Sequence, residues 1–355
     1  MLKTAILKSD LFLEHDPGFN HVESPSRLEV VYEGLESVKG SRSLSFPAPV
    51  PAERADLLRI HSAEHVARIA ATAGLPFDSL DPDTSTSARS YEAARLAAGA
   101  VIEATRQVCA GAAANAFALV RPPGHHAERG WAKGFCLFNN VAVAAAYALD
   151  ELELQRVLIV DWDLHHGNGT QNSFYQSDRV LYFSTHMFPY FPGSGTLHEL
   201  GEGRGEGFNL NVPLTGGVND AGYAAIFNQV LVPVARQFQP ELILISAGYD
   251  IYHGDPLGTM AVTEAGFAYL TRVVKALAGE LCEGRLVLTL EGGYSLQGLR
   301  DGVLVTLGEM AGEAFLPGLE SRMTPLAKAR FGASGNLSPE ALVTLRRAYA
   351  LHWQI

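Results

Sequence analysis

Short apolar runs alternate along the chain with longer segments whose apolar residues recur at helical spacing. Continuous apolar runs are typical of strands that are buried on both faces, and this alternation predicts an α/β fold. We expect a central, mostly parallel sheet with helices on both faces. The predicted strands are Thr4–Leu7, Ala116–Val120, Val157–Val160, Val180–Ser184, Leu242–Ser246 and Leu286–Leu290. The predicted helices are Asn139–Leu152, Ala221–Phe238, Glu264–Glu280 and Leu296–Ala314.

Five of these strands run directly into residues that can do chemistry. Ligands of parallel α/β sheets bind beyond the carboxyl ends of the strands, so these segments should meet at one edge. We therefore expect a single active site there. The segments are Arg121–His126, Asp161–Gln171, Ser184–His186, Ser246–Asp250 with Gly254–Pro256, and Glu291–Tyr294.

The segment that follows Val157–Val160 is the most informative. Alternate side chains of an extended chain share one face, so Asp161, Asp163 and His165 should point the same way. Oxygen and nitrogen ligands without thiolate suit zinc, or another first-row metal, in a hydrolytic site. Taken alone, the Asp-X-Asp pair could equally be a helix cap or a solvated turn, and the fragment leaves both interpretations open.

Composition narrows the class of protein. The chain has 355 residues, 47% of them hydrophobic, with a net charge of −11, which argues against a sequence-independent nucleic-acid binder. Its mean hydropathy of +0.07 allows a large core, and no apolar stretch is long enough to predict a membrane span. The apolar segment at the amino terminus is too short for a signal peptide, and charged residues follow it too closely. The three cysteines have no paired spacing, which suits a reducing compartment, and we expect a cytoplasmic protein.

The remaining segments bear on domain organisation. Gly193–Gly207 is glycine-rich and polar and predicts a loop, without the Gly-Lys-Ser/Thr ending of a phosphate-binding loop. Leu316–Ser338 predicts an irregular stretch before a last helix, Pro339–His352, with Ser338 as N-cap. We expect one catalytic domain over residues 1–318 and a helical extension over 319–355. The extension would pack on that domain, and a homo-oligomer contact through it stays open.

Taken in order, the motifs resemble the zinc-dependent deacetylase family, which comprises histone deacetylases and acetylpolyamine amidohydrolases. The resemblance extends from His21–Arg27 to beyond Tyr294 and implies a single-domain arginase/deacetylase-like fold. Asp-Trp-Asp, together with Asn168 where class I enzymes carry Asp, favours the class II-like, bacterial-type group. The matching stretches are Arg121–His126, Gly134–Cys136 with Asn139-Asn140, Asp161–Gln171, Gly254–Pro256 and Glu291–Tyr294.

The resemblance implies metal sites. A catalytic zinc keeps an open position beside three protein ligands, and it acts as a Lewis acid on the amide and on water. The implied zinc ligands, for one ion per chain, are Asp163, His165 and Asp255. A potassium ion is implied near Asp161, Ser184 and Thr185.

The resemblance also implies the catalytic roles. His126 would take a proton from the attacking water and return it to the leaving amine. His125 would be a second imidazole oriented by Asp161, and Asn168 would orient His126. Tyr294 would donate a hydrogen bond to the carbonyl oxygen as negative charge develops on it.

The substrate-binding residues follow in the same way. Phe135 and Phe191 would form the walls of a narrow tunnel for a linear alkyl chain, and Gly134 would let that chain approach the backbone. Arg27 would lie at the floor of the tunnel. Leu257 lies where relatives specialised for acetylpolyamines can carry Glu, so an acetyl-lysine substrate is favoured.

The predicted function is therefore hydrolysis of the acetyl amide of N-acetyl-lysine in proteins or peptides. Acetylpolyamines are the alternative substrates, and longer acyl-lysines are less favoured. Neither nucleic acid nor membrane is expected as a partner. An arginase-like hydrolase with two manganese ions and a non-catalytic acyl-lysine binding module are the rival classes. The paired histidines of Arg121–His126 favour a single zinc, and the retained Tyr294 favours catalysis.

Overall fold

A computed structural model of the chain describes residues 2–316, 318 and 337–355. It contains an eight-stranded sheet in the order β2-β1-β5-β10-β9-β6-β7-β8, in which all neighbouring strands are parallel. The α/β fold with a parallel sheet is thus confirmed. The strands are β1 Thr4–Leu7, β2 Leu44–Ser45, β5 Asn115–Ala118, β6 Val157–Asp161, β7 Val180–Met187, β8 Asn209–Leu214, β9 Leu242–Ala247 and β10 Leu286–Leu290; β3 Asp78–Asp81 and β4 Thr84–Thr86 form a separate hairpin.

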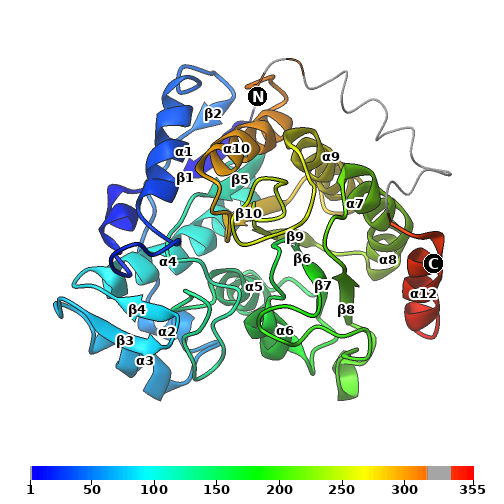
Figure 1. Ribbon diagram of the computed structural model, residues 1–355, viewed down its shortest axis with the longest axis horizontal. Helices are drawn as coiled ribbons and strands as arrows, with labels where there is room; N and C mark the ends of the chain where they lie inside the picture. The colour runs from blue at the N-terminus through cyan, green and yellow to red at the C-terminus, as the bar shows by residue number, and fades with distance from the viewer. Residues whose placement is uncertain (1, 317, 319–336) are drawn as a thin grey trace.

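Helices cover both faces of the sheet. In Figure 1, α1, α10, α9, α7 and α8 lie on one side of the strands, and α4, α5 and α6 lie on the other. This arrangement excludes water from the central strands and explains why they are continuously apolar. The helices are α1 Ser26–Glu36, α2 Arg54–Leu57, α3 Ala63–Ala70, α4 Ser90–Cys109, α5 Asn140–Asp150, α6 Asn168–Phe174, α7 Asp220–Ile226, α8 Val232–Phe238, α9 Glu264–Leu281, α10 Leu296–Ala311 and α12 Pro339–Tyr349.

Local signals set several helix ends. The Ser295 side chain accepts a hydrogen bond from the amide of Gly298 and begins α10, and Gly312, in the left-handed conformation, ends it. The segment Ala221–Phe238, predicted as one helix, consists of α7 and α8 joined by a π-helical turn, Phe227–Leu231.

Some elements are not predicted from the sequence. The edge strand β8 alternates Asn209 and Asn211 with apolar residues and contains a proline, so it lacks the apolar run of the central strands. β2 has only two residues, and the predictions also omit the hairpin of β3 and β4. The long helix α4 is rich in alanine, and its buried face carries few large apolar side chains to mark it.

The C-terminal segment packs against this edge strand. Ser338 caps α12 as predicted, its side chain accepting a hydrogen bond from Ala341. The Tyr349 hydroxyl donates to the carbonyl of Asn211, and the Trp353 indole donates to the carbonyl of Gly207 at 2.7 Å. Residues 319–336 of the predicted extension lie outside the described residues, and the domain boundary at 318 stays a prediction. None of the described helices combines the length and apolar character needed to cross a membrane.

Candidate active site

The loops that follow the strands enclose a pocket of about 210 Å³. Its lining residues are Asp83, Pro123, His125, His126, Gly134, Phe135, His165, Tyr190, Phe191, Leu257, Gly292 and Tyr294. All except Asp83, Pro123, Tyr190 and Gly292 are residues that the sequence predicts for the site. The structure therefore brings together side chains from loops more than 150 residues apart in the chain.

A candidate metal group lies at this pocket. Asp163, His165 and Asp250 each offer one ligand atom, and these atoms lie within 4.8 Å of one another. His165 Nδ1 is 3.2 Å from Asp163 Oδ1 and 3.0 Å from Asp250 Oδ2. A Cβ atom on Gly292 would approach Asp250 Oδ2 to 2.4 Å, so glycine is required beside these carboxylates. Two buried carboxylates and an imidazole fit zinc as a donor set.

Asp255, the third ligand implied by the resemblance, lies outside this group. Its Oδ2 accepts hydrogen bonds from the amides of Tyr294 at 2.7 Å and Ser295 at 2.9 Å, and its Oδ1 accepts one from Leu257. Its role as a ligand stays a prediction, and the structure offers Asp250 in its place. The sequence analysis notes Asp250 at a strand end without giving it a role. An acidic residue between Tyr249 and Ile251, directly after an apolar run, is the sequence signal that could have identified it.

The carboxylates and imidazoles of this region are buried and lie within hydrogen-bonding distance of one another. Burial alone would lower the pKa of His125, but the charges of Asp161 and Asp163 raise it to about 10. Burial is likewise outweighed at His165, where hydrogen bonds with Asp163 and Asp250 raise the pKa to about 9. Burial and the charge of Asp163 raise the pKa of Asp250 to about 7. Protons thus offset the excess negative charge here, which a bound cation could also do.

The two adjacent histidines are held differently. His125 Nδ1 lies 3.0 Å from Asp161 Oδ2, whereas His126 Nδ1 lies 2.8 Å from the amide oxygen of Asn168. Burial, followed by the charges of His125 and His165, holds the pKa of His126 well below its usual value. Because Nδ1 donates to Asn168, the neutral ring of His126 has its lone pair on Nε2. The Asn168 amide nitrogen in turn donates to Glu128 at 2.6 Å, a contact that the sequence does not indicate.

The residues proposed for potassium lie next to one another on β6 and β7. Asp161 and Ser184 are paired in the sheet register, and the Thr185 hydroxyl is 3.5 Å from the carbonyl oxygen of Asp161. Asp161 Oδ2 also accepts a hydrogen bond from Tyr182, a residue missing from the prediction. The Ser184 hydroxyl is bonded to His186 Nδ1 at 2.9 Å. The potassium site itself stays a prediction.

The pocket walls are aromatic. The Phe135 ring packs edge-on at 6.0 Å from Tyr294, and the Phe191 ring packs edge-on at 5.1 Å from His126. Gly134 and Phe135 both have positive φ angles, of 56° and 68°. A Cβ atom on Gly134 would lie 2.4 Å from the His126 ring, so only glycine fits between the wall and the histidine.

Two rim residues are missing from the prediction. The Tyr190 hydroxyl donates to the carbonyl of Leu257 at 2.8 Å and fixes one side of the entrance. Asp83 Oδ1 accepts a hydrogen bond from the amide of Gly134 at 3.0 Å and ties the β3–β4 hairpin to the opposite side. Only the position of Tyr190 beside Phe191 gives any sequence signal for either.

Arg27 belongs to a fully buried arginine cluster that consists of Glu23, Arg27, Arg121 and His15. It donates to Glu23 Oε1 at 2.9 Å, and Arg121 donates to both oxygens of the same carboxylate. Arg27 also donates to the carbonyls of residues 291 and 293, and its guanidinium lies 5.0 Å from the centre of the Tyr294 ring. It therefore supports the turn that carries this tyrosine.

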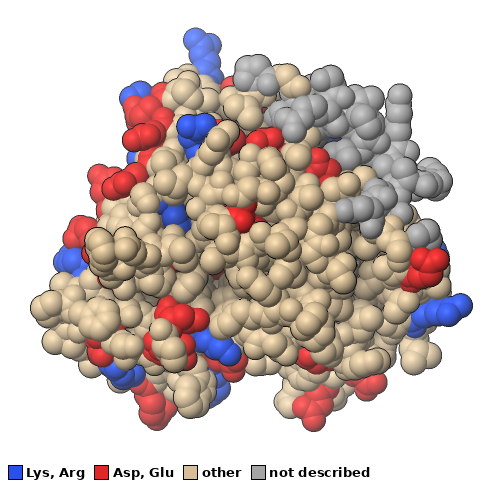
Figure 2. Space-filling view, viewed as in Figure 1, with Lys and Arg blue, Asp and Glu red and all other residues tan. Residues whose placement is uncertain are grey.

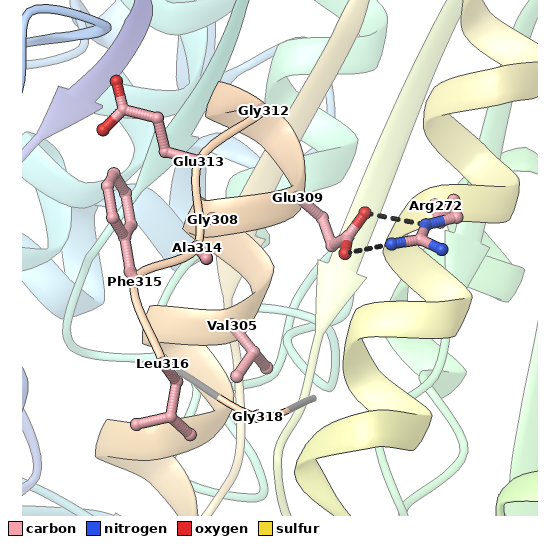
Figure 3. Close-up of a pocket in the computed structure, with 10 residues that line it drawn as sticks. All are labelled: Arg272, Val305, Gly308, Glu309, Gly312, Glu313, Ala314, Phe315, Leu316 and Gly318. Atoms are coloured by element: carbon pink, nitrogen blue, oxygen red, sulfur yellow. Dashed lines mark hydrogen bonds and ion pairs between the residues drawn. The ribbon is translucent and has the colours of Figure 1, made fainter. Parts of the chain in front are cut away.

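Another, larger cavity of about 430 Å³ lies away from these residues, along α9, α10, residues 312–316 and Gly318. Figure 3 shows Glu309 and Arg272 pointing toward each other between the two helices. They form a bidentate ion pair, in which the Arg272 guanidinium donates to the two Glu309 carboxylate oxygens at 2.7 and 2.9 Å. None of its described lining residues belongs to the predicted site.

In the orientation of Figure 2, the middle of the face in view is mostly uncharged.

Comparison with known proteins gives consistent matches. Residues 21–310 match the model of the histone deacetylase domain. The chain is 39% identical over 297 residues to a probable deacetylase of Archaeoglobus fulgidus, covering 83% of this chain and 82% of that protein. It is 40% identical to histone deacetylase 18 of Arabidopsis thaliana over 84% of this chain and 46% of the relative. It is 38% identical to the human polyamine deacetylase HDAC10 over 94% of this chain and 50% of the relative.

The crystal structure of the HDA15 HD domain superposes with a TM-score of 0.84 at 35% sequence identity, covering 99% of this chain and 98% of that one. The chain spans about half or less of the length of several plant, yeast and human relatives that it matches.

Proposed function

Because the chain belongs to the histone deacetylase family, whose members named above are hydrolases acting on amides, we propose that it removes the acetyl group from N-acetyl-lysine in peptides or proteins. The observation that carries the proposal is the pocket of about 210 Å³ at the strand ends. It joins a neutral imidazole, a phenol and a candidate zinc group within aromatic walls.

A zinc ion held by Asp163, His165 and a third carboxylate would act as a Lewis acid on the amide and on the attacking water. His126, neutral and with its lone pair on Nε2, takes the proton from that water. The same imidazole then returns the proton to the lysine amine as the amide bond breaks. Asn168 holds the ring in the tautomer that this transfer requires.

Two further groups stabilise the charge that develops. The Tyr294 hydroxyl donates to the carbonyl oxygen as it becomes negative, an interaction typically worth about 3 kcal/mol. His125, whose Nδ1 lies 3.0 Å from Asp161 Oδ2, places a second imidazole beside the reacting groups. Phe135 and Phe191 exclude water from the alkyl stem of lysine, which strengthens these interactions.

The entrance supports a lysine substrate over a polyamine. Leu257 lines the pocket and offers no charge to a distal ammonium group. Acetylpolyamines are the second candidate, since one relative over 94% of the chain is named a polyamine deacetylase. Longer acyl groups would need additional room beside Tyr294, and the Arg27 guanidinium is packed 5.0 Å from the centre of that ring.

The proposal is tested by comparing kcat/KM on an acetyl-lysine peptide, on acetylspermidine and on a peptide with a long-chain acyl-lysine. Each rate is measured with and without a chelator. We expect the acetyl-lysine peptide to be the best substrate and the chelator to abolish turnover. A higher kcat/KM on acetylspermidine would replace the proposal with the polyamine alternative.

The role of Leu257 at the pocket entrance is tested by Leu257→Glu. A carboxylate at this position would attract the distal ammonium of a polyamine, so the ratio of acetylspermidine to acetyl-lysine rates should rise about tenfold, equivalent to roughly 1.4 kcal/mol. Leu257→Gln is the control for size without charge. An unchanged ratio in the Glu variant would show that the gate does not select the substrate.

A further inference from the structure

One further carboxylate near the catalytic histidines, that of Glu291, has no role in the proposed reaction. Glu291 is fully buried at the carboxyl end of β10. Its Oε2 accepts hydrogen bonds from two consecutive backbone amides, of Gly124 at 2.7 Å and His125 at 3.1 Å. Its Oε1 accepts one from the Ser246 hydroxyl at 3.1 Å. The side chain therefore joins the loop after β5 to β9 and β10.

The backbone of the same turn reaches the other parts of the site. The amide of Gly292 donates to Asp163 Oδ2 at 2.7 Å, and the amide of Tyr294 donates to Asp255 Oδ2 at 2.7 Å. The Glu291 side chain holds the histidine loop, and the amides of Gly292 and Tyr294 hold the two aspartates. The turn therefore fixes the histidines, these acidic residues and the tyrosine relative to one another.

We propose that Glu291 is a positioning residue that sets the distance of the His125–His126 pair from Asp163 and Tyr294. This inference rests on the proposed deacetylase reaction. Hydrogen bonds from amides to a carboxylate are about twice as strong as neutral ones, and a buried carboxylate is tolerated only when its oxygens are engaged. A misplacement of a catalytic group by about 1 Å can lower a rate about 100-fold.

The chain contains a control residue at the amino-terminal end of the strands, opposite the end that carries Glu291. Glu241 precedes β9, and its Oε2 accepts hydrogen bonds from two consecutive amides, of Gln155 at 2.5 Å and Arg156 at 3.3 Å. It makes the same kind of contact as Glu291 but far from the pocket. A purely structural role would make the two residues equivalent in their effect on catalysis.

The test uses the zinc-loaded full chain and an acetyl-lysine peptide. Glu291→Ala should lower kcat about 100-fold with KM and zinc content nearly unchanged, because the histidine loop is released. Glu291→Gln should restore most of kcat, since its amide oxygen can accept both N–H groups and its nitrogen can donate to Ser246. Glu241→Ala should leave kcat unchanged.

The inference is overturned if Glu291→Ala stays close to the wild-type kcat, if Gln is no better than Ala, or if Glu241→Ala lowers kcat equally. Should the Ala variant fail to fold, Glu291→Asp decides, because its shorter side chain cannot reach both amides and should lower kcat in a folded protein. Hydrogen exchange at the amides of Gly124 and His125 gives a readout independent of turnover. Slow exchange in the wild type and fast exchange in the Asp variant would support positioning even if no acetyl amide proved to be a substrate.

Discussion

Two buried groups of charged side chains meet at the turn Glu291–Tyr294, and they differ in how their charge is balanced. In the arginine cluster, one carboxylate, that of Glu23, is bonded by Arg27 and Arg121. The remaining guanidinium N–H groups donate to backbone carbonyls, including those of Phe12 and His15. Every charge in this cluster has a fixed partner.

In the acidic cluster, by contrast, the charged groups are not all paired. We define this cluster as Asp161, Asp163, Asp250, His125 and His165. Its carboxylates outnumber its imidazoles, and His165 Nδ1 lies between two of them, 3.2 Å from Asp163 Oδ1 and 3.0 Å from Asp250 Oδ2. Burial and the neighbouring carboxylate raise the pKa of Asp250 to about 7, so its charge is not fully stabilised.

The difference teaches how to separate scaffold from reactive site. A buried ion cluster whose hydrogen bonds are complete has no reason to bind anything further and serves the fold. A buried cluster with excess carboxylate can hold a cation, and two members of this one, His125 and His165, line the pocket. The comparison holds only if loss of the two clusters has different consequences, for activity in one case and for stability in the other.

Metal removal should have the largest effect. Exhaustive chelation should abolish hydrolysis of an acetyl-lysine peptide, and stoichiometric Zn²⁺ should restore it, because the acidic cluster then regains its missing charge. Circular dichroism should show a folded protein throughout, since the arginine cluster and the sheet do not depend on zinc. Undiminished turnover by protein shown to be metal-free would contradict the cation assignment.

The identity of the third ligand sharpens this test. If Asp250 completes the group, Asp250→Asn should lose zinc while Asp255→Asn retains it, because the Asp255 oxygens are engaged by backbone amides. The opposite result would support the ligand implied by the sequence. Zinc content per chain after gel filtration distinguishes the two.

His126→Ala should have the next largest effect. Loss of the proposed general base should lower kcat about 1,000-fold, equivalent to roughly 4 kcal/mol, with zinc content unchanged. The stability of the protein should not fall, because His126 is outside the arginine cluster. Near wild-type kcat in a folded, zinc-loaded variant would remove His126 from the mechanism.

The sequence predicts the centre of this molecule better than its edges. The apolar runs of β6 and β10 identify buried strands, and the alternation of Asp163 and His165 predicts that they share one side, where the structure places both in the candidate metal group. Asp250 and Asp83 need tertiary structure, because their contacts span 85 residues to His165 and 51 residues to Gly134. Such contacts leave no local pattern in the sequence. The turn of the β3–β4 hairpin, which carries Asp83, has the same polar composition as turns without a function.

Glu23→Gln tests the arginine cluster directly. Removing one charge should leave two buried guanidinium groups without their shared carboxylate, and we expect the free energy of unfolding in urea to fall by about 3 kcal/mol. The kcat per folded molecule should change far less than in His126→Ala. Glu36→Gln, which removes a surface carboxylate paired with Lys39, is the control and should leave the urea midpoint unchanged.

The pH dependence of stability should give the smallest effect and the most specific one. Burial alone would raise the pKa of Glu23, but Arg121, His15 and Arg27 hold it well below its usual value. Its contribution to stability should therefore be complete above the pKa of the unfolded chain, about 4.3, and be lost as the pH falls toward the folded value. The difference in unfolding free energy between wild type and Glu23→Gln should shrink with acidification below pH 5. A constant difference down to pH 3 would mean that the variant acts through packing, and that the fixed pairing of its charged groups is not what distinguishes this cluster from the acidic one.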